Sequence, residues 1–277
     1  MQKDCVRIRV LVENQALQGL EAEHGLSYLI EADGKKGLFD TGDTDMAIRN
    51  AETLGEDIKN LDWIALSHGH YDHTGGLKPV LSVQKKRVIL FAHPAAFIEK
   101  YRVKNGDYKS IGIRMTRKEI SEFADIVETK QPTVISERLT LTGEIPRVVP
   151  YETPFSGFVK SNNGVDDIDP ISDDMSLIIK SPDGISVLFG CGHAGPVNTL
   201  QCVKSITNAS SFRLVAGGMH LLNSDEDRIR RTVDAFNELG VLRASPVHCS
   251  GEPAEQAFKT AYGDKSSRFS AGVEEVL

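Results

Sequence analysis

The most informative stretch of this sequence is Ser67–Gly76, which reads SHGHYDHTGG. It follows Trp63–Leu66, a short apolar run bounded by polar residues, which indicates a buried strand. The histidine-rich stretch therefore leaves the end of a strand and enters a loop. Within six residues it offers four side chains that can bind metal ions, namely His68, His70, Asp72 and His73.

The spacing of these four side chains suits two ions. Side chains two positions apart in an extended segment point to the same side, so His68 and His70 can hold one ion together. Asp72 and His73 fall where the chain turns toward a helix, and they can face a second ion. Neutral imidazoles and a carboxylate suit zinc, iron or manganese. An HxHxDH match would arise by chance in roughly one chain in two thousand, so a metal site is favoured over solvated loop histidines.

Three further histidines each follow a predicted strand amid small residues. They are His193 after 185–189, His220 after 213–216 and His248 after 244–247. Active-site groups gather on loops that rigid strands hold, so His193 and His248 are predicted to join the metal site. His220 could protonate a leaving group or bind substrate, and a packed histidine beneath the site is an equal alternative. His24 and His93 lack such a setting and are predicted to be structural.

Strands alternate with helices along the chain, which predicts an α/β layer arrangement in a single domain. The segment 151–170 is poor in apolar residues and rich in Pro, Gly and Asn, which predicts a long loop. Strands are expected at Val6–Val12, Ser27–Glu31, Gly37–Asp40, Trp63–Leu66, Arg87–Ala92, Ser176–Ser181, Ile185–Phe189, Arg213–Ala216 and Ala244–Val247, and helices at Asp45–Leu54, Leu77–Val83, Ala95–Arg102 and Asp225–Leu239.

The composition is that of an ordinary globular protein, with 277 residues of which 40% are apolar and 26% charged. Four cysteines without CxxC spacing indicate no disulfide framework and a reducing compartment. No run of apolar residues resembles a signal peptide or a membrane span, so a cytoplasmic location without a membrane partner is expected. The net charge of −7 argues against nucleic acid as a partner. The sequence predicts no particular oligomeric state.

Four phrases of the sequence, taken in order, resemble the metallo-β-lactamase superfamily. Within it they are similar to the subgroup of metal-dependent hydrolases related to the dihydropterin ribofuranosyl-aminobenzene phosphate synthase of methanopterin biosynthesis. The resemblance spans nearly the whole chain, with 85–170 the least informative part. The phrases are Leu38–Gly42 (LFDTG), Ser67–Gly76, Gly190–Gly195 (GCGHAG) and His248–Gly251 (HCSG).

This resemblance implies a four-layer αββα sandwich, a single domain over 1–277, with two divalent metal ions at one rim. Zinc is the favoured ion, with iron and manganese as alternatives. His68 and His70 would hold the first ion, and Asp72, His73 and His248 the second. Asp40 would orient a ligand histidine through its other ring nitrogen.

The sequence departs from the family pattern at Cys191, where most members have a bridging aspartate. His193, two residues later, is therefore predicted as the missing ligand. Cys191 itself and the pair Asp173 and Asp174 are weaker candidates for the same role.

The leading functional hypothesis is hydrolysis of an ester or phosphoester by a metal-activated water, steered by the carboxylate of Asp72. A metal-dependent transferase that joins a pterin methyl diphosphate to an aminobenzene ribofuranosyl phosphate is the alternative. Its rings could stack on loop aromatic residues. A non-enzymatic metal-binding protein is a further alternative, disfavoured because glycines keep the rim open. The candidate stacking residues are Tyr71, Tyr151, Phe155 and Phe158.

A basic stretch falls in the segment, about 85–170, that family members vary to shape substrate access. Between Lys100 and Lys118 it holds seven basic residues and one acid, Asp107. A solvated lysine-rich surface would explain this pattern. Its position makes a small-molecule substrate that is phosphorylated or otherwise anionic an equal alternative. Arg114 and Arg117 are the predicted substrate-binding residues.

Overall fold

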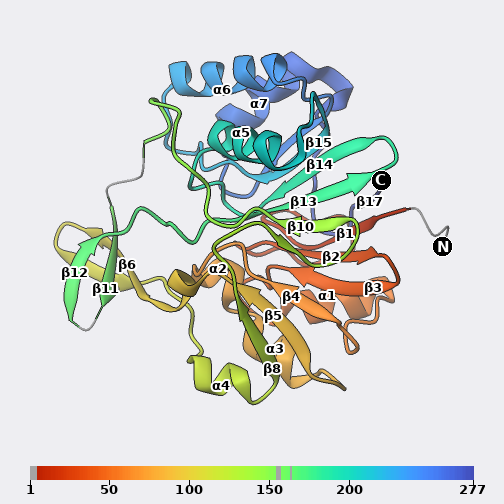
Figure 1. Cartoon of the computed structure of the whole chain (residues 1–277), viewed down its shortest axis with the longest axis vertical. Helices are drawn as coiled ribbons and strands as arrows, with labels where there is room; N and C mark the ends of the chain where they lie inside the picture. The colour runs from red at the N-terminus through yellow and green to blue at the C-terminus, as the bar shows by residue number, and fades with distance from the viewer. Residues whose placement is uncertain (1–4, 154–156, 163) are drawn as a thin grey trace.

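Two β-sheets pack face to face at the centre of the molecule, and helices cover the outer face of each sheet (Figure 1). The computed structural model describes residues 5–153, 157–162 and 164–277. The arrangement is the four-layer αββα sandwich that the sequence predicted.

The first sheet runs β17-β1-β2-β3-β4-β5-β8, and the second runs β16-β15-β14-β13-β10-β9. The first sheet contains β17 (Glu274–Val276), β1 (Arg7–Val12), β2 (Ser27–Ala32), β3 (Lys35–Phe39), β4 (Trp63–Ala65), β5 (Val88–Ala92) and β8 (Ala124–Glu128). The second contains β16 (Ala244–Val247), β15 (Phe212–Gly218), β14 (Gly184–Phe189), β13 (Ser176–Ser181), β10 (Leu139–Leu141) and β9 (Thr133–Val134).

A third sheet projects from the side of the sandwich, at the left of Figure 1. It runs β12 (Val165–Ile168), β11 (Phe158–Asn162), β6 (Glu99–Lys104) and β7 (Asp107–Ser110). The helices are α1 (Met46–Leu54), α2 (Tyr71–Thr74), α3 (Leu77–Ser82), α4 (Arg117–Ser121), α5 (Pro196–Thr207), α6 (Glu226–Glu238) and α7 (Glu252–Tyr262), with short 3-10 turns η1 (Pro94–Phe97) and η2 (Gly263–Lys265).

Alternation of apolar and polar residues explains how the strands pack. In β1, Ile8 and Val10 are fully buried, whereas Arg7 and Arg9, which alternate with them, are half-buried and pair with Glu56. The buried side chains join Tyr28, Leu177, Leu188 and others in the layer between the two sheets. Separate apolar clusters lie beneath α1 and α3 on one side and beneath α5, α6 and α7 on the other. Burial of these faces is the main favourable contribution to folding.

Parallel pairing brings the carboxyl ends of several strands to the same region. Strands β3, β4 and β5 are parallel neighbours, and so are β14, β15 and β16. The residues that follow these ends are Asp40 after β3, His68 after β4, Cys191 after β14, His220 after β15 and His248 after β16. The sandwich therefore carries the predicted site residues on the loops at one rim.

Two predictions about the segment 85–170 are wrong. The helix expected at Ala95–Arg102 is instead the short turn η1 followed by strand β6, because β6 pairs with both β7 and β11. The loop expected over 151–170 contains the hairpin of β11 and β12. Every residue of β12 is exposed, so that strand carries no alternating apolar pattern that sequence analysis could detect.

Within the described ranges, no helix combines the length and apolar character that a membrane crossing requires.

Gly37 offers a test of the packing between β3 and β4. A Cβ atom at Gly37 would lie 2.1 Å from the Trp63 ring and 2.6 Å from the Trp63 carbonyl oxygen. Trp63 is 1% exposed and has no room to move away. We expect Gly37→Ala to lower the free energy of unfolding by about 3 kcal/mol in urea titrations. Lys35→Ala, at an exposed position of the same strand, is the control. Equal stability of the two variants would contradict this packing.

Candidate metal centre

Three buried histidines form the first cluster of donor atoms. One ring nitrogen of each of His68, His70 and His193 lies within 4.8 Å of the others. His68 and His70 leave the end of β4, and His193 follows β14. The Nε2 atoms of all three are buried and have no hydrogen-bond partner among the described residues. Each such nitrogen costs about 1–3 kcal/mol unless a bound group satisfies it, and three that converge on one point suit a metal ion.

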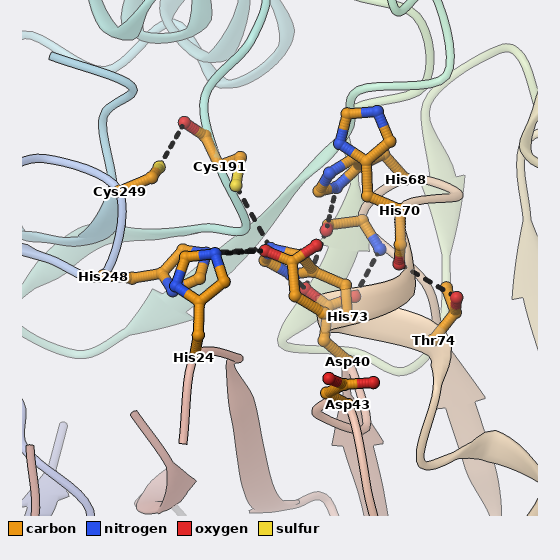
Figure 2. Close-up of polar contacts among 12 residues, drawn as sticks. His24, Asp40, Asp43, His68, His70, His73, Thr74, Cys191, His248 and Cys249 are labelled. Atoms are coloured by element: carbon orange, nitrogen blue, oxygen red, sulfur yellow. Dashed lines mark hydrogen bonds and ion pairs between the residues drawn. The ribbon is translucent and has the colours of Figure 1, made fainter. Parts of the chain in front are cut away.

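A second cluster contains Asp72, His73, Cys191 and His248. Figure 2 shows His73, Cys191 and His248 with their side chains pointing toward one another. The His73 Nε2 atom lies 3.2 Å from His248 Nε2 and 3.1 Å from Cys191 Sγ. The Asp72 Oδ2 atom lies 3.3 Å from His248 Nε2. These distances are those of side chains that point their donor atoms at one place.

Cys191 belongs to two groups of neighbouring donor atoms. Its sulfur lies with the donor atoms of the second cluster, and it also forms a group with His193 and His220 in which the donor atoms lie within 4.8 Å of one another. Whether this thiol serves in place of the bridging aspartate of the family pattern stays a prediction. His193 lies in the first cluster, and its role as a metal ligand also stays a prediction.

A network behind the histidines fixes their orientation. The buried carboxylate of Asp40 accepts hydrogen bonds from the Ser67 backbone N–H, from the Ser67 hydroxyl and from His73 Nδ1, each at 2.7 Å. The Ser67 hydroxyl also lies 2.9 Å from His68 Nδ1. His248 Nδ1 is 3.0 Å from Asn14 Oδ1. Because the Nδ1 atoms of these rings are engaged, their Nε2 atoms face the clusters.

Electrostatics prepare most of these groups to act as ligands. Burial lowers the pKa of His70 to about 3 and holds the pKa of His68 and His193 well below the ordinary value, so these rings are neutral. Burial by itself would raise the pKa of Asp72, but the neighbouring histidines hold it well below its usual range. Asp72 is therefore a carboxylate.

His73 differs from the other histidines. Burial by itself would lower the pKa of His73, but the carboxylates of Asp40 and Asp72 raise it to about 9. A metal ion at this cluster would take the place of that proton, because a ligating imidazole must be neutral. The combined donor set of imidazole nitrogen, carboxylate oxygen and thiol sulfur fits zinc or iron better than magnesium or calcium.

A cavity of about 180 Å³ opens at the clusters. Asp72, Cys191 and His193 form part of its wall, so donor atoms are accessible from it. The wall also contains four apolar or aromatic side chains and two exposed cations. These are Tyr71, Ile111, Phe158 and Leu222, with Arg102 and Lys109.

His220 also lines this cavity, and its ring centroid lies 4.3 Å from that of His193. It is half-buried, and its backbone N–H points to Cys249 Sγ at 3.3 Å. Its φ of 47° lies in the left-handed region, as do those of Asp40 and His248. Non-glycine residues adopt this conformation at a cost, and they gather at functional sites.

Neither weaker aspartate candidate lies in a cluster. Both oxygens of Asp173 are engaged, one by the Gly69 N–H at 2.7 Å and the other by Lys100 Nζ at 2.8 Å. Asp174 accepts a hydrogen bond from the Ala194 N–H at 2.7 Å, and burial raises its pKa to about 7. These carboxylates support the loops around the site instead of pointing into it.

The basic stretch divides into different environments. Lys100 is 2% exposed and forms ion pairs with Asp169 and Asp173, so it does not belong to a solvated basic surface. Arg114 pairs with Asp43 at 2.6 Å, and Arg117 pairs with Glu128. Neither arginine lines the cavity, where Arg102 and Lys109 are found instead.

His24 is a site residue that sequence analysis missed. Its Nε2 atom lies 3.3 Å from Asp72 Oδ2, and its ring stacks on that of His248 with centroids 4.9 Å apart (Figure 2). The Asp72 carboxylate raises the pKa of His24. His24 follows no strand end, so no local pattern marks it. His93 lies in none of the donor clusters of the described residues, and its Nδ1 accepts a hydrogen bond from the Ala95 N–H at 3.1 Å.

The four aromatic candidates separate in space. Tyr71 and Phe158 line the cavity. Tyr151 lies against Arg231, whose guanidinium is 5.5 Å from the ring centroid. Phe155 lies outside the described residues.

Comparison with known proteins identifies relatives along nearly the whole chain. The model of the metallo-beta-lactamase superfamily matches residues 20–163. An uncharacterized protein of Methanocaldococcus jannaschii is 34% identical over 245 residues, which are 88% of this chain and 90% of the relative. From the same organism, 7,8-dihydropterin-6-methyl-4-(beta-D-ribofuranosyl)-aminobenzene-5'-phosphate synthase is 30% identical over 281 residues, which are 97% of this chain and 96% of the relative. The crystal structure of a metal-dependent hydrolase of the beta-lactamase superfamily has a TM-score of 0.84 at 32% identity and covers 98% of both chains.

Replacement of Asp40 tests whether the network behind the histidines tunes metal binding. Asp40→Asn keeps the side-chain shape but offers one acceptor oxygen to the three donors that Asp40 binds. We expect its zinc affinity, measured by competition with a chromophoric chelator, to fall about 10–100-fold. Asp43→Asn, in the adjacent turn, removes the ion pair with Arg114 and should leave the affinity unchanged. Unchanged affinity in Asp40→Asn would show that Asp40 serves only the fold.

Proposed function

Because this chain belongs to the metallo-beta-lactamase superfamily, we propose that it is a metal-dependent hydrolase of an anionic ester, above all a phosphoester. The observation that supports this most strongly is the pair of donor clusters at the wall of an open cavity. A structural metal site is closed by protein ligands, whereas a catalytic one keeps an accessible position. Arrangement and accessibility together favour catalysis over simple metal storage.

We propose His68, His70 and His193 as the ligands of a first ion and Asp72, His73 and His248 as those of a second, with Cys191 between them. Two divalent ions, with zinc favoured, would supply Lewis acidity and an activated water. Asp72 stays ionised between His24 and His248, which suits it to orient a water molecule. His220 faces the same cavity and is placed to donate a proton to a leaving group.

The anionic character of the substrate follows from the cations of the cavity. Arg102 and Lys109 line it, and neither forms an ion pair with a residue of the described ranges. Tyr71, which also lines the cavity, has two cations near its ring: Lys109 Nζ lies 5.7 Å and Arg114 Cζ 5.5 Å from the ring centroid. We therefore assign the recognition of an anionic group to Arg102 and Lys109, while Arg114 lies over the Tyr71 ring. The projecting sheet that carries them is the proposed substrate-shaping segment.

A second candidate function is a metal-dependent transferase. The relative that covers 97% of this chain is named a synthase that makes a dihydropterin compound with an aminobenzene ribofuranosyl phosphate. The aromatic side chains of Tyr71 and Phe158 in the cavity wall could stack on such rings. Release of diphosphate that requires a second organic substrate would identify this activity, whereas a hydrolase needs water alone.

Metal content is the first test of the proposed function. Protein purified without added metal should carry about two equivalents of zinc, iron or manganese by mass spectrometry. His70→Ala removes one donor of the first cluster and should lose at least one equivalent while the circular dichroism spectrum stays unchanged. The loaded protein should hydrolyse a nitrophenyl phosphodiester or phosphomonoester, and His70→Ala should not. Protein that neither carries metal nor takes it up on titration would overturn the proposal.

The cations of the cavity give a second test. We expect Arg102→Ala and Lys109→Ala each to raise KM for the hydrolysed phosphoester about tenfold, with a smaller effect on kcat, because exposed charges mainly bind substrate. Arg117→Ala removes a basic residue of the same segment outside the cavity and should leave KM unchanged. An equal rise in KM for all three variants would indicate a diffuse effect of net charge.

A further inference from the structure

A second cavity, of about 210 Å³, adjoins the one at the metal clusters. The two cavities share part of their walls and both reach the donor side chain of His193. The shared residues are Phe158, His193, His220 and Asn223. The second cavity contains one charged side chain that the first does not, the guanidinium of Arg228.

Arg228 lies in the first turn of α6, where a capping interaction fixes its backbone. Asp225 caps this helix, and its carboxylate accepts a hydrogen bond from the Arg228 backbone N–H at 2.8 Å. The Arg228 side chain is half-buried, and its Nε atom is buried without a hydrogen-bond partner. Among the described residues, no carboxylate forms an ion pair with Arg228. A guanidinium in this situation is a strong binding group for an oxyanion.

The other arginines of α6 have partners. Arg230 pairs with Asp227 at 2.6 Å and with Asp234 at 3.0 Å. Arg231 pairs with Asp227 at 2.7 Å and lies over the Tyr151 ring. The Asp227 carboxylate is therefore paired with the exposed Arg230 and Arg231. Of the three arginines of α6, Arg228 is the one that lines the second cavity.

The neighbouring charged residues Glu152 and Arg147 do not neutralise Arg228 by an ion pair. Glu152 is buried, and its two oxygens accept hydrogen bonds from the Val197 N–H at 2.9 Å and the Asn198 N–H at 2.7 Å. Burial raises the pKa of Glu152, and Arg228 opposes that shift from a distance. Arg147 adds a second positive charge, and it donates to the carbonyl oxygens of His193 and Pro170.

We propose that Arg228 binds a carboxyl or phosphoryl group of the substrate in this second cavity. Arg102 and Lys109 lie in the first cavity, and His193 and His220 lie in the wall that both cavities share. The substrate is then a molecule with two anionic groups, one in each cavity, and the bond that reacts lies between them at the metal rim. This inference rests on the proposed function in one respect: the anion that Arg228 binds is part of the substrate that reacts at the metal centre.

Calorimetric titration of inorganic phosphate tests the assignment. The starting protein is the Arg102→Ala/Lys109→Ala double variant freed of metal with EDTA, so that the cations of the first cavity and the metal ions do not contribute. We expect phosphate binding that weakens at least tenfold when Arg228→Met is added and partly recovers with Arg228→Lys. Arg230→Met, which removes a paired arginine of the same helix, is the matched control and should not change the Kd. A parallel titration with acetate distinguishes a phosphoryl from a carboxyl preference.

An unchanged Kd in the Arg228→Met variant, or an equal loss in Arg230→Met, would overturn the assignment. So would the absence of binding of either anion to the starting protein. Because the titration uses metal-free protein, its result is independent of catalysis. Phosphate binding that depends on Arg228 in a protein without hydrolase activity would reject the proposed hydrolysis and retain the anion site.

Discussion

The buried carboxylate of Asp40 is the interaction on which the rest of the site depends. It follows the end of β3, accepts three hydrogen bonds at 2.7 Å, and joins this strand to Ser67 of the neighbouring loop and to His73 of α2. A buried charge is tolerated only where hydrogen bonds and opposite charge compensate its loss of water. The same contacts raise the pKa of His73 and fix its ring. Fold and site are therefore stabilised by one group, and the left-handed backbone of Asp40 is the local cost.

A second buried network attaches the projecting sheet to the same loop. Lys100 of β6 pairs with Asp169 at 2.7 Å and with Asp173 at 2.8 Å, and Asp173 accepts the Gly69 N–H between the first two histidines. Removal of one member would leave a buried charge uncompensated, which is far more costly than the loss of a surface ion pair. The sheet that carries Arg102 and Lys109 is thus held in a defined position relative to His68 and His70, which a substrate bound to both requires.

The sequence predicted those parts of the molecule that local patterns encode. The alternation of strands and helices predicted an α/β arrangement, and the family resemblance of four short phrases implied the αββα sandwich, which the comparisons confirm. The structure gathers the histidines of these phrases at one rim. Predictions failed where tertiary contacts decide. In the sequence, Lys100 is one of the seven residues of the basic stretch, and only the folded chain brings Asp169 and Asp173 to it. The sequence of β6 fits a helix, and only its pairing with β7 and β11 makes it a strand. His24 reaches Asp72 from a loop far away in the sequence, and no spacing rule could reveal that contact.

Hydrolysis and group transfer can use the same metal ligands, so the residues outside the clusters must separate them. A hydrolase has to admit water beside Asp72, whereas a transferase has to hold a second organic molecule there and exclude water. In this chain the cavity wall next to Asp72 combines the polar rings of His24 and His220 with the apolar Phe158 and Leu222. The His24 side chain is more than half exposed and stacks against His248, and its Nε2 atom lies 3.3 Å from the buried Asp72 carboxylate. Under the proposed hydrolysis, water would reach Asp72 past the exposed His24 ring, and the aromatic wall would bind the anionic substrate.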